Sequence, residues 1–415
     1  MLTGVLLGLV ALAFVLIVIE DLIHVNKAKT TLFFGTLCWI LLFVFAEQPH
    51  GAAHVQEQLE HNLLEIATLW LFLMSTMTFV AYLNSKGYIS HLVQKVLPDS
   101  MTERKLMFVL GTFAFVFSSF ADNVTATLVS IAVIAGVQLE PIKKVKYGAL
   151  IVFAVNSGGV SLITGDVTTL MFFLEGKVTI PHLLLLVPPA LVAVYLLVFM
   201  LSIGMNQPLT VSKTKHQIES QDHIIAALFL TTILGCLAMN IWFNIPPVLT
   251  FLFGLGTMFL VAQALFRKRK QQRHILSFIR DVEFETLLFF LGVLLLVGVL
   301  KELNFLKNFT SLYETLPPVQ ANFLMGLSSA LIDNVPLTAA LLKADLVMTN
   351  AEWLLLTYAV GVGGSLLVIG SAAGIIAMSK IKELTFGNYL KLFVYLFVAF
   401  CVGYSGVYYM GQFAN

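Results

Sequence analysis

Long apolar stretches recur along the whole of this 415-residue chain, and they constrain its fold more than any other feature. A helix needs about 20 apolar residues to cross the roughly 30 Å hydrocarbon core of a bilayer. We expect ten such crossings, at residues 2–20, 31–46, 63–83, 148–175, 181–204, 224–241, 247–265, 284–300, 352–379 and 388–410. Only 11% of the residues are charged and 59% are hydrophobic, which is unlike a soluble protein. The sequence therefore predicts an all-α polytopic membrane protein, with the lipid bilayer as its surroundings.

Several functional classes are excluded by what the sequence contains. The formal net charge of +1 argues against a nucleic-acid partner. The three cysteines (Cys38, Cys236 and Cys401) lie within apolar stretches and form no disulfide framework. The chain has no GxxxxGK[ST], CxxC or HExxH motif. We therefore expect neither an enzyme nor an ATP-driven pump, and no cofactor.

Two apolar segments, 106–137 and 319–349, do not fit a simple crossing. Each has roughly thirty residues, about 45 Å as one helix, and carries a polar pair at its centre. These pairs are Asp122-Asn123 and Asp333-Asn334. Two arms of about 20 Å each would reach the middle of the bilayer and return, so we expect re-entrant hairpins. The alternative is one long, tilted, broken helix in each segment.

Charge placement favours the hairpins. Basic residues flank segment 106–137 on both sides, whereas the flanks of 319–349 are poor in them. Because the Lys and Arg residues of membrane proteins concentrate in cytoplasmic loops, the first hairpin should enter from the cytoplasmic side and the second from the external side. Both chain termini and a polar loop at 47–62 are then external. Of the 24 Lys and Arg residues, all lie inside except Lys177, Lys301, Lys307 and Lys343.

The polar signatures of the first half recur in the second. "SSFADNVTATL" at 118–128 matches "SSALIDNVPLTAAL" at 328–341, and "AVNSGGVSLITGD" at 154–166 matches "AVGVGGSLLVIGS" at 359–371. Each half holds five crossings and one hairpin, and an odd number of crossings inverts the second half. Inverted repeats with broken helices are typical of secondary transporters. We expect a first repeat at 1–204, a cytoplasmic linker at 205–223 and a second repeat at 224–415, with broken helices at 148–175 and 352–379.

The paired polar tips have two interpretations. Asp and Asn are good helix N-caps, so each pair could simply cap the second arm of its hairpin. This explanation suits Asn123 and Asn334 as well as a binding role does. It suits the aspartates less, because an ionisable group at mid-membrane costs about 2.5–3.5 kcal/mol and a neutral residue can cap equally well. We therefore expect Asp122 and Asp333 to be functional.

Asp166 has a second polar environment around it. Three glycines (Gly158, Gly159 and Gly165) can break the helix there and free carbonyl oxygens for a hard cation. Neutral oxygens are supplied by Asn156, Ser157, Thr164, Thr168 and Thr169, although a single hydroxyl more often serves helix packing. The second half has Gly361 in place of Asn156 and Ser371 in place of Asp166. The predicted Na⁺ site is therefore lopsided, with Asp122, Asp166 and Asp333 as its carboxylates.

Carboxylates without neighbouring Lys or Arg form a site for cations. Desolvated carboxylates hold protons until a cation replaces them, so Na⁺ or Li⁺ competes with H⁺. A site that binds either ion and opens to each side in turn exchanges them, which is antiport. The exchange is electrogenic if two protons move for each Na⁺. His61 and Glu65, one helical turn apart near an external end, are candidates for a proton relay or pH sensing. The alternative for them is an interfacial pair.

Three motifs carry a resemblance to a known family. The two "DN" tips, "NSGGVSLITGDVTTL" and the early "EDLIHVNKAKTTLFFG" resemble NhaD-type sodium:proton antiporters of the ion transporter superfamily. The resemblance implies a multi-pass exchanger of the bacterial inner membrane that moves Na⁺ or Li⁺ against H⁺, and a homodimer with an elevator-like motion. The site residues that it implies are Asp122, Asn123, Asn156, Asp166, Thr168, Thr169, Ser329, Asp333 and Asn334.

Three other functions compete with antiport. A sodium-coupled di- or tricarboxylate symporter of the same fold would need neutral tips and a basic or amide-rich pocket. An intramembrane aspartyl protease also pairs two aspartates, but its GxGD pattern is replaced here by "ITGD". A scaffold or receptor needs no carboxylates at mid-membrane and typically has a soluble domain.

Overall fold

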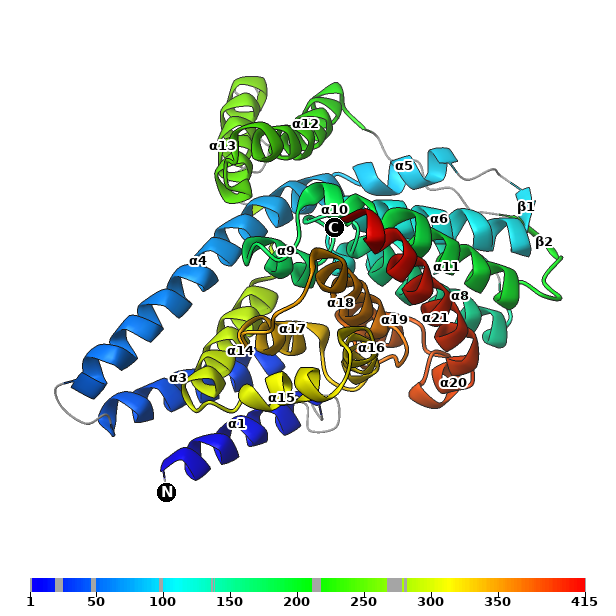
Figure 1. Cartoon of the computed structure of the whole chain (residues 1–415). Helices are drawn as coiled ribbons and strands as arrows, with labels where there is room; N and C mark the ends of the chain where they lie inside the picture. The colour runs from blue at the N-terminus through cyan, green and yellow to red at the C-terminus, as the bar shows by residue number, and fades with distance from the viewer. Residues whose placement is uncertain are drawn as a thin grey trace. The chain divides into compact units, whose positions relative to one another are not determined.

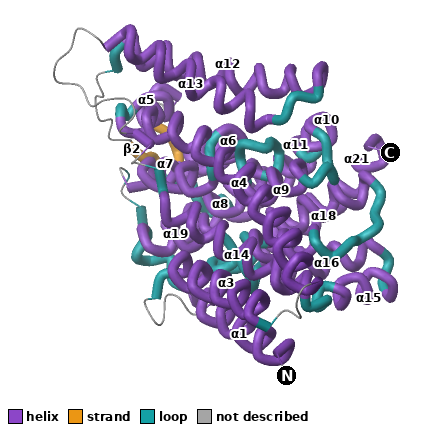
Figure 2. Tube along the Cα trace, turned by 90° about the vertical axis from the view of Figure 1, so that its left-hand side faces the viewer, coloured by secondary structure: helices purple, strands orange, loops and turns teal. Residues whose placement is uncertain are grey.

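The computed structural model describes residues 2–18, 25–45, 50–96, 100–135, 137, 139–210, 218–266, 278–279 and 282–414. These residues form two compact units. Unit 1 comprises Met1–Leu73, Glu283–Ala321 and Val335–Val347. Unit 2 comprises Met74–Val282, Asn322–Asn334 and Met348–Asn415. Helices dominate both units, as Figures 1 and 2 show.

Unit 1 is built on the pairing of α3 with α14. Its elements are α1 (Leu2–Val18), α3 (Lys27–Val44), the first part of α4 (His50–Ser85), α14 (Phe284–Glu302), α15 (Lys307–Thr315), the start of α16 (Pro318–Ser329) and most of α17 (Asn334–Leu342). A Cβ at Gly35 of α3 would lie 2.9 Å from the Gly292 carbonyl oxygen of α14. The Trp39 indole also donates a hydrogen bond to the Leu295 carbonyl at 3.0 Å. Small residues thus let the two helices approach closely, as is common in membranes.

Unit 2 contains the polar signatures and most of the remaining helices. Its elements are the rest of α4, α5 (Tyr88–Val96), α6 (Glu103–Phe120), α7 (Asn123–Ala135), α8 (Pro141–Gly159), α9 (Val167–Leu174), α10 (Ile180–Leu184), α11 (Val187–Leu201), α12 (Ser220–Phe243), α13 (Pro247–Phe266), the rest of α16, α18 (Asn350–Gly363), α19 (Ala372–Lys380), α20 (Phe386–Leu390), α21 (Phe393–Gly411) and the 3₁₀ turn η2 (Gln412–Ala414). Helix α8 packs against α6, α7 and α18, and α12 packs against α13.

The helices confirm a polytopic membrane protein. Seven helices of the described chain are long and apolar enough to cross a membrane, at Lys27–Val44, Gly51–Ser85, Ile180–Leu201, Ser220–Phe243, Pro247–Leu265, Phe284–Glu302 and Phe393–Ala414. The three other expected crossings are α1, whose apolar part covers Leu2–Ile17, and two helices that are interrupted. Helices α1 and α18 are short, with 17 and 14 residues, whereas α8 has 19 residues but carries three lysines near its start.

The predicted polar loop at 47–62 is wrong, because α4 already begins at His50. At 36 residues α4 is about 54 Å long and exceeds the thickness of a hydrocarbon core. Its polar first turns are rich in Ala, Gln, Glu and Leu, which favour helix. Gln56 also donates to Glu60 at 2.8 Å, one turn apart.

Two helices break where the sequence places its glycine clusters. Helix α8 ends at Gly159 and α9 starts at Val167, while α18 ends at Gly363 and α19 starts at Ala372. The expected breaks within 148–175 and 352–379 are therefore present, although the helices extend beyond those limits at 141–174 and 350–380.

An ion pair joins the two broken helices away from the breaks. Lys144 of α8 lies 2.8 Å from the carboxylate of Glu383, which follows α19. The hydrogen bond from Lys144 holds the pKa of the Glu383 carboxyl below its ordinary value.

A small sheet is an exception to the all-α prediction. Strands β1 (Ser100–Thr102) and β2 (Pro208–Thr210) pair antiparallel, with Ser100 opposite Thr210. Strand β2 lies in the segment predicted as the linker 205–223, of which residues 211–217 lie outside the described part of the chain. The basic stretch 267–277 is also outside it.

Candidate cation site

Asp122 and Asn123, at the tip between α6 and α7, make different kinds of contact. The Asp122 carboxylate accepts a hydrogen bond from the Thr125 backbone N–H at 2.9 Å and another from the Thr125 hydroxyl at 2.9 Å. It therefore caps α7, as the structural interpretation predicts. Asn123 does not cap: its Oδ1 accepts from the Ser118 hydroxyl at 2.8 Å, and its Nδ2 donates to Asn156 Oδ1 at 3.4 Å. The amide, rather than the carboxylate, links this tip to α8.

Asp166 is the buried carboxylate of the first broken helix. Its side chain is N-cap to α9, where Oδ1 accepts from the Thr168 backbone N–H at 3.2 Å. The other oxygen, Oδ2, accepts from Asn334 Nδ2 at 3.4 Å, so the second DN tip reaches the first half's carboxylate. Only 5% of Asp166 is exposed. The Asn123 amide also interacts with this carboxylate. Two amides and a helix N-terminus thus converge on one buried Asp.

The second break has a matching arrangement with neutral groups. Ser371 is N-cap to α19, where its Oγ accepts from the Gly374 N–H at 3.3 Å. Asn156 of α8 donates from Nδ2 to the same Ser371 Oγ at 2.9 Å. Each N-cap side chain is therefore contacted by an amide from the other half of the sequence.

The two helix breaks also share close contacts between a glycine and the N-cap residue. A Cβ at Gly159 would lie 3.2 Å from Asp166 Cβ, and one at Gly364 would lie 3.3 Å from Ser371 Cβ. Both pairs are separated by seven residues, in equivalent places of the two signatures. The sequence repeat therefore corresponds to repeated local geometry.

The two halves differ at one position that matters for charge. Where α8 has Asn156 to contact Ser371, α18 has Gly361, and a Cβ there would lie 3.6 Å from Asp166 Oδ2. Gly361 thus leaves Asp166 without the amide that Asn156 supplies to Ser371. The two N-caps therefore meet different amides: Asp166 interacts with Asn123 and Asn334, whereas Ser371 interacts with Asn156.

Several hydroxyls around the first break point into the protein without a partner. Among the described residues, the side-chain oxygens of Ser157, Ser161 and Thr169 are buried and make no hydrogen bond, while the Thr168 hydroxyl interacts with Asp166. A buried hydroxyl without a partner costs about 1–3 kcal/mol, so such a cluster is poorly suited to packing alone. Oxygens of this kind are ligands that hard cations accept.

Two other predicted residues have structural contacts. The Ser329 hydroxyl donates to the Val360 carbonyl at 2.7 Å, and the Thr164 hydroxyl donates to the Ser119 carbonyl at 2.8 Å. Both bonds join the chain next to a DN pair to an interrupted helix. Their donors are occupied, whereas their oxygens can still accept or coordinate.

The three predicted carboxylates do not form one compact cluster. Asp333 is half-buried and interacts electrostatically with Asp166, while both Asp122 oxygens are engaged by Thr125. Within the described ranges, no three His, Cys, Asp or Glu side chains could hold a metal ion together. In this conformation a cation would therefore take one carboxylate, that of Asp166, and neutral oxygens for the rest.

Comparisons with known proteins agree with this chemistry. The chain matches the model of the citrate transporter family, CitMHS, over residues 1–363. It is 33% identical over 412 residues to the Na⁺/H⁺ antiporter NhaD of Vibrio cholerae, covering 92% of this chain and 86% of that protein. This chain belongs to the NhaD family. It is also 32% identical to NhaD of Alkalimonas amylolytica, covering 96% and 90%, and 27% identical to sodium/proton antiporter 1 of Arabidopsis thaliana, covering 93% and 69%.

Sequence reasoning missed some contacts of this site. It did not select Ser118, which holds Asn123, although the Ser-Ser pair before each DN tip could have indicated it. It also treated Ser371 only as the loss of an acid, whereas the structure makes it the acceptor for Asn156.

His61 and Glu65 lie in unit 1 and have a partner that was not predicted. Glu65 Oε2 lies 2.8 Å from Lys343 Nζ, and Glu65 Oε1 lies 2.9 Å from His61 Nδ1. Lys343 also donates to Asn62 Oδ1 at 2.5 Å, and only 10% of its side chain is exposed. The His61 side chain is 68% exposed. The cluster is therefore a largely buried ion pair with an exposed histidine at its edge.

Replacing Glu65 by Gln is expected to lower the free energy of unfolding by about 3 kcal/mol, because it leaves the Lys343 ammonium buried and unpaired. The double variant E65Q/K343Q should recover most of that loss, since neither charge remains. Thermal unfolding in detergent measures both. His61→Gln is the control and should have little effect. An E65Q protein as stable as the unchanged chain contradicts the ion-pair assignment.

Proposed function

We propose that this protein exchanges Na⁺, or Li⁺, for H⁺ across a membrane, with Asp166 as the shared ligand. The observation that carries the proposal is the buried Asp166 carboxylate at a helix break, with amides and partnerless hydroxyls around it. Na⁺ and H⁺ can each neutralise this carboxylate, but not both together. The relatives named as sodium:proton antiporters support the same exchange.

The architecture supports alternating access. We propose inverted repeats at 1–204 and 224–415, joined by the linker 205–223, with segments 106–137 and 319–349 as re-entrant hairpins from opposite sides. The repeated glycine contacts and the two helix breaks support a repeat, and the charge pattern supports its inversion. Both termini are then external. Cysteine accessibility at Gly4 and Tyr409 to an impermeant reagent, in intact cells, tests the orientation.

The other predicted residues assist Asp166 in binding the cation. Asn123 and Asn334 position and partly neutralise it, Thr168 and Thr169 supply oxygens, and Asn156 holds Ser371 in the second break. Asp122 and Asp333 supply further negative charge near the tips, and Ser329 fastens the second tip. We also propose that Glu65 and His61 act as a proton relay or pH sensor. Measurements of antiport across pH on Glu65→Gln and His61→Gln test this role.

Everted membrane vesicles test exchange directly. After a respiratory substrate establishes ΔpH, added NaCl or LiCl should dissipate it. The apparent Na⁺ affinity should fall as the pH falls, by about tenfold per pH unit if one proton competes and about a hundredfold if two compete. The steeper slope supports electrogenic exchange. A Na⁺ affinity that does not change with pH would contradict competition at a carboxylate.

A second function is favoured by the family description, which names citrate. A citrate symporter would need positive or amide groups for the anion. None of the segments that form the site (106–135, 147–176, 319–334 and 350–379) contains Lys or Arg. Na⁺-dependent uptake of labelled citrate or succinate into right-side-out vesicles would revive this alternative.

Physiological setting and assembly follow from the same proposal. We place the protein in a bacterial inner membrane, where Na⁺ extrusion would serve salt tolerance and pH homeostasis. We also propose a homodimer with an elevator-like motion, which rests on analogy with the superfamily. Mass measurement of the detergent-solubilised protein tests the dimer, and a monomer would count against it.

A further inference from the structure

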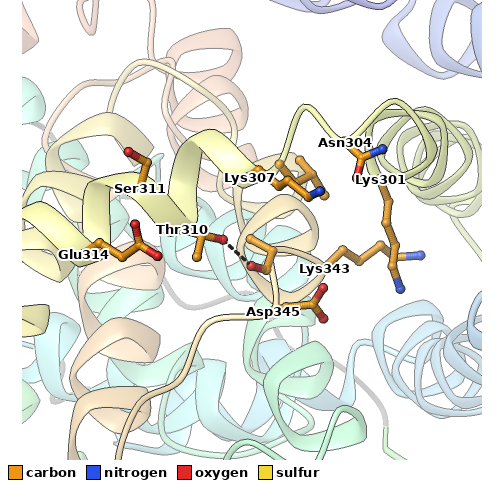
Figure 3. A pocket seen from close by; sticks show the side chains of 10 residues that line it. Lys301, Asn304, Lys307, Thr310, Ser311, Glu314, Lys343 and Asp345 are labelled. Atoms are coloured by element: carbon orange, nitrogen blue, oxygen red, sulfur yellow. Dashed lines mark hydrogen bonds between the residues drawn. The ribbon is translucent and has the colours of Figure 1, made fainter.

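Unit 1 contains a pocket of about 410 Å³ that the proposed exchange does not use. It lies where the end of α14, helix α15 and the turn after α17 meet, as Figure 3 shows. The volume falls within the usual range of small-ligand sites, which is about 300–1,000 Å³. Most of the side chains that line it are polar or charged.

The pocket walls are held by defined backbone features. Asn304 (φ 54°) and Asp345 (φ 52°) both adopt the left-handed conformation, which Asn and Asp tolerate better than most residues. The Thr310 hydroxyl donates to the Ala344 carbonyl at 2.8 Å and ties α15 to the turn after α17. Figure 3 shows this bond at the centre of the pocket. The site is therefore preformed.

Charges of both signs line the pocket. Lys343 is already balanced by Glu65 at 2.8 Å. Two lysines, Lys301 and Lys307, and two acids, Glu314 and Asp345, make no ion pair within 4.0 Å among the residues that the structure describes. In Figure 3, Glu314 lies at one end of the pocket and Lys301 at the other. A ligand with one sign of charge would meet repulsion from half of this lining.

The surroundings indicate a ligand at a membrane surface. Lys301, Lys307 and Lys343 are three of the four basic residues predicted on the external side, and all three line this one pocket. Two apolar side chains next to it in the chain are exposed, Phe305 by 43% and Val347 by 96%. Apolar side chains beside a polar cavity suit an amphiphile.

We propose that this pocket binds a phosphate–ammonium zwitterion, the headgroup chemistry of phosphatidylethanolamine. Lys301 and Lys307 would bind the phosphate through charge-assisted hydrogen bonds, and Glu314 and Asp345 would bind the ammonium group. Both signs of charge in the lining are then satisfied by one ligand. The acyl chains of a lipid would run beside Phe305 and Val347. This proposal is independent of the cation exchanged at Asp166.

Native mass spectrometry of the purified full chain in detergent tests the proposal. Phosphatidylethanolamine should be retained about tenfold more than phosphatidylglycerol, whose headgroup lacks the ammonium. K301Q/K307Q should reduce its retention by about tenfold or more. E314Q/D345N should reduce phosphatidylethanolamine binding but increase phosphatidylglycerol binding, a change of opposite sign that misfolding would not produce. Lys177→Gln, the remaining external lysine, is the matched control and should change neither.

Competition with free phosphoethanolamine identifies the source of the ligand. Displacement of the lipid supports recognition of the headgroup alone, and retention supports a requirement for the acyl chains. Equal retention of the two lipids by the unchanged chain and by both double variants would overturn the proposal. If K301Q/K307Q does not fold, the single variant Lys307→Gln replaces it.

Discussion

Replacing Asp166 by asparagine is expected to reduce Na⁺-dependent dissipation of ΔpH by at least about a hundredfold, because losing a charged ligand costs about 3 kcal/mol or more. Asparagine has the shape of aspartate and is itself a good N-cap, so α9 should keep its start. The amide can neither take up a proton nor neutralise Na⁺. Vesicle assays at matched protein amounts measure the loss, and thermal unfolding in detergent checks that the fold is kept.

Asp222→Asn is the matched control for this experiment. Asp222 is also buried, with 2% exposure, and it also engages a helix start, that of α12. Its carboxylate accepts from the Tyr82 hydroxyl at 2.7 Å and does not contact the helix breaks. We expect this variant to be less stable and still to respond to Na⁺. If Asp166→Asn retains exchange, the cation must bind elsewhere, and Asp122 and Asp333 become the principal candidates.

Replacing Gly158 by alanine is expected to lower the free energy of unfolding by at least about 2 kcal/mol, because a Cβ there would overlap the Phe115 backbone carbonyl of α6. Backbone atoms cannot move aside as a flexible side chain would. Gly363→Ala should have a similar effect, since its Cβ would overlap the Gly326 carbonyl of α16. Thermal unfolding of the two variants in detergent measures both losses.

Gly235→Ala is the control, because nothing lies within 4 Å of a Cβ at that position in α12. This substitution should be neutral or slightly stabilising. An unchanged melting temperature for Gly158→Ala would show that α6 and α8 are farther apart than the structure places them. A loss at Gly158 without one at Gly363 would show that the two repeated contacts are not energetically equivalent.

Positions of helices and breaks could be predicted from the sequence because they depend on local chemistry. Apolar runs marked the crossings, although α4 and α8 begin well before the predicted starts at 63 and 148, and Gly158, Gly159 and Gly165 marked the first interruption. The polar segment 47–62 was mistaken for a loop, because its helix depends on pairs within one turn rather than on an apolar face. The polar first turns of this 36-residue helix lack the apolar periodicity that indicates an amphipathic helix.

The sequence selected several polar residues that the structure brings together, but it did not indicate how they contact one another. The repeat indicated Asp166, Asn123 and Asn334 because polar residues within an apolar membrane segment are energetically costly and therefore often functional. That Asp122 caps its own helix while Asn123 reaches Asn156 depends on which way two neighbouring side chains point. No spacing in the sequence distinguishes those directions.

The sequence alone determined that this protein spans a membrane, repeats its polar signatures and carries one acid where its second half carries Ser371. These properties follow from composition and from residue identity at fixed spacing. Only the tertiary structure decided that Asn334 contacts Asp166, 168 residues away, and that Lys343 pairs with Glu65. Such pairs depend on how distant helices pack, because a hydrogen bond is set by atomic distances that the order of residues does not specify.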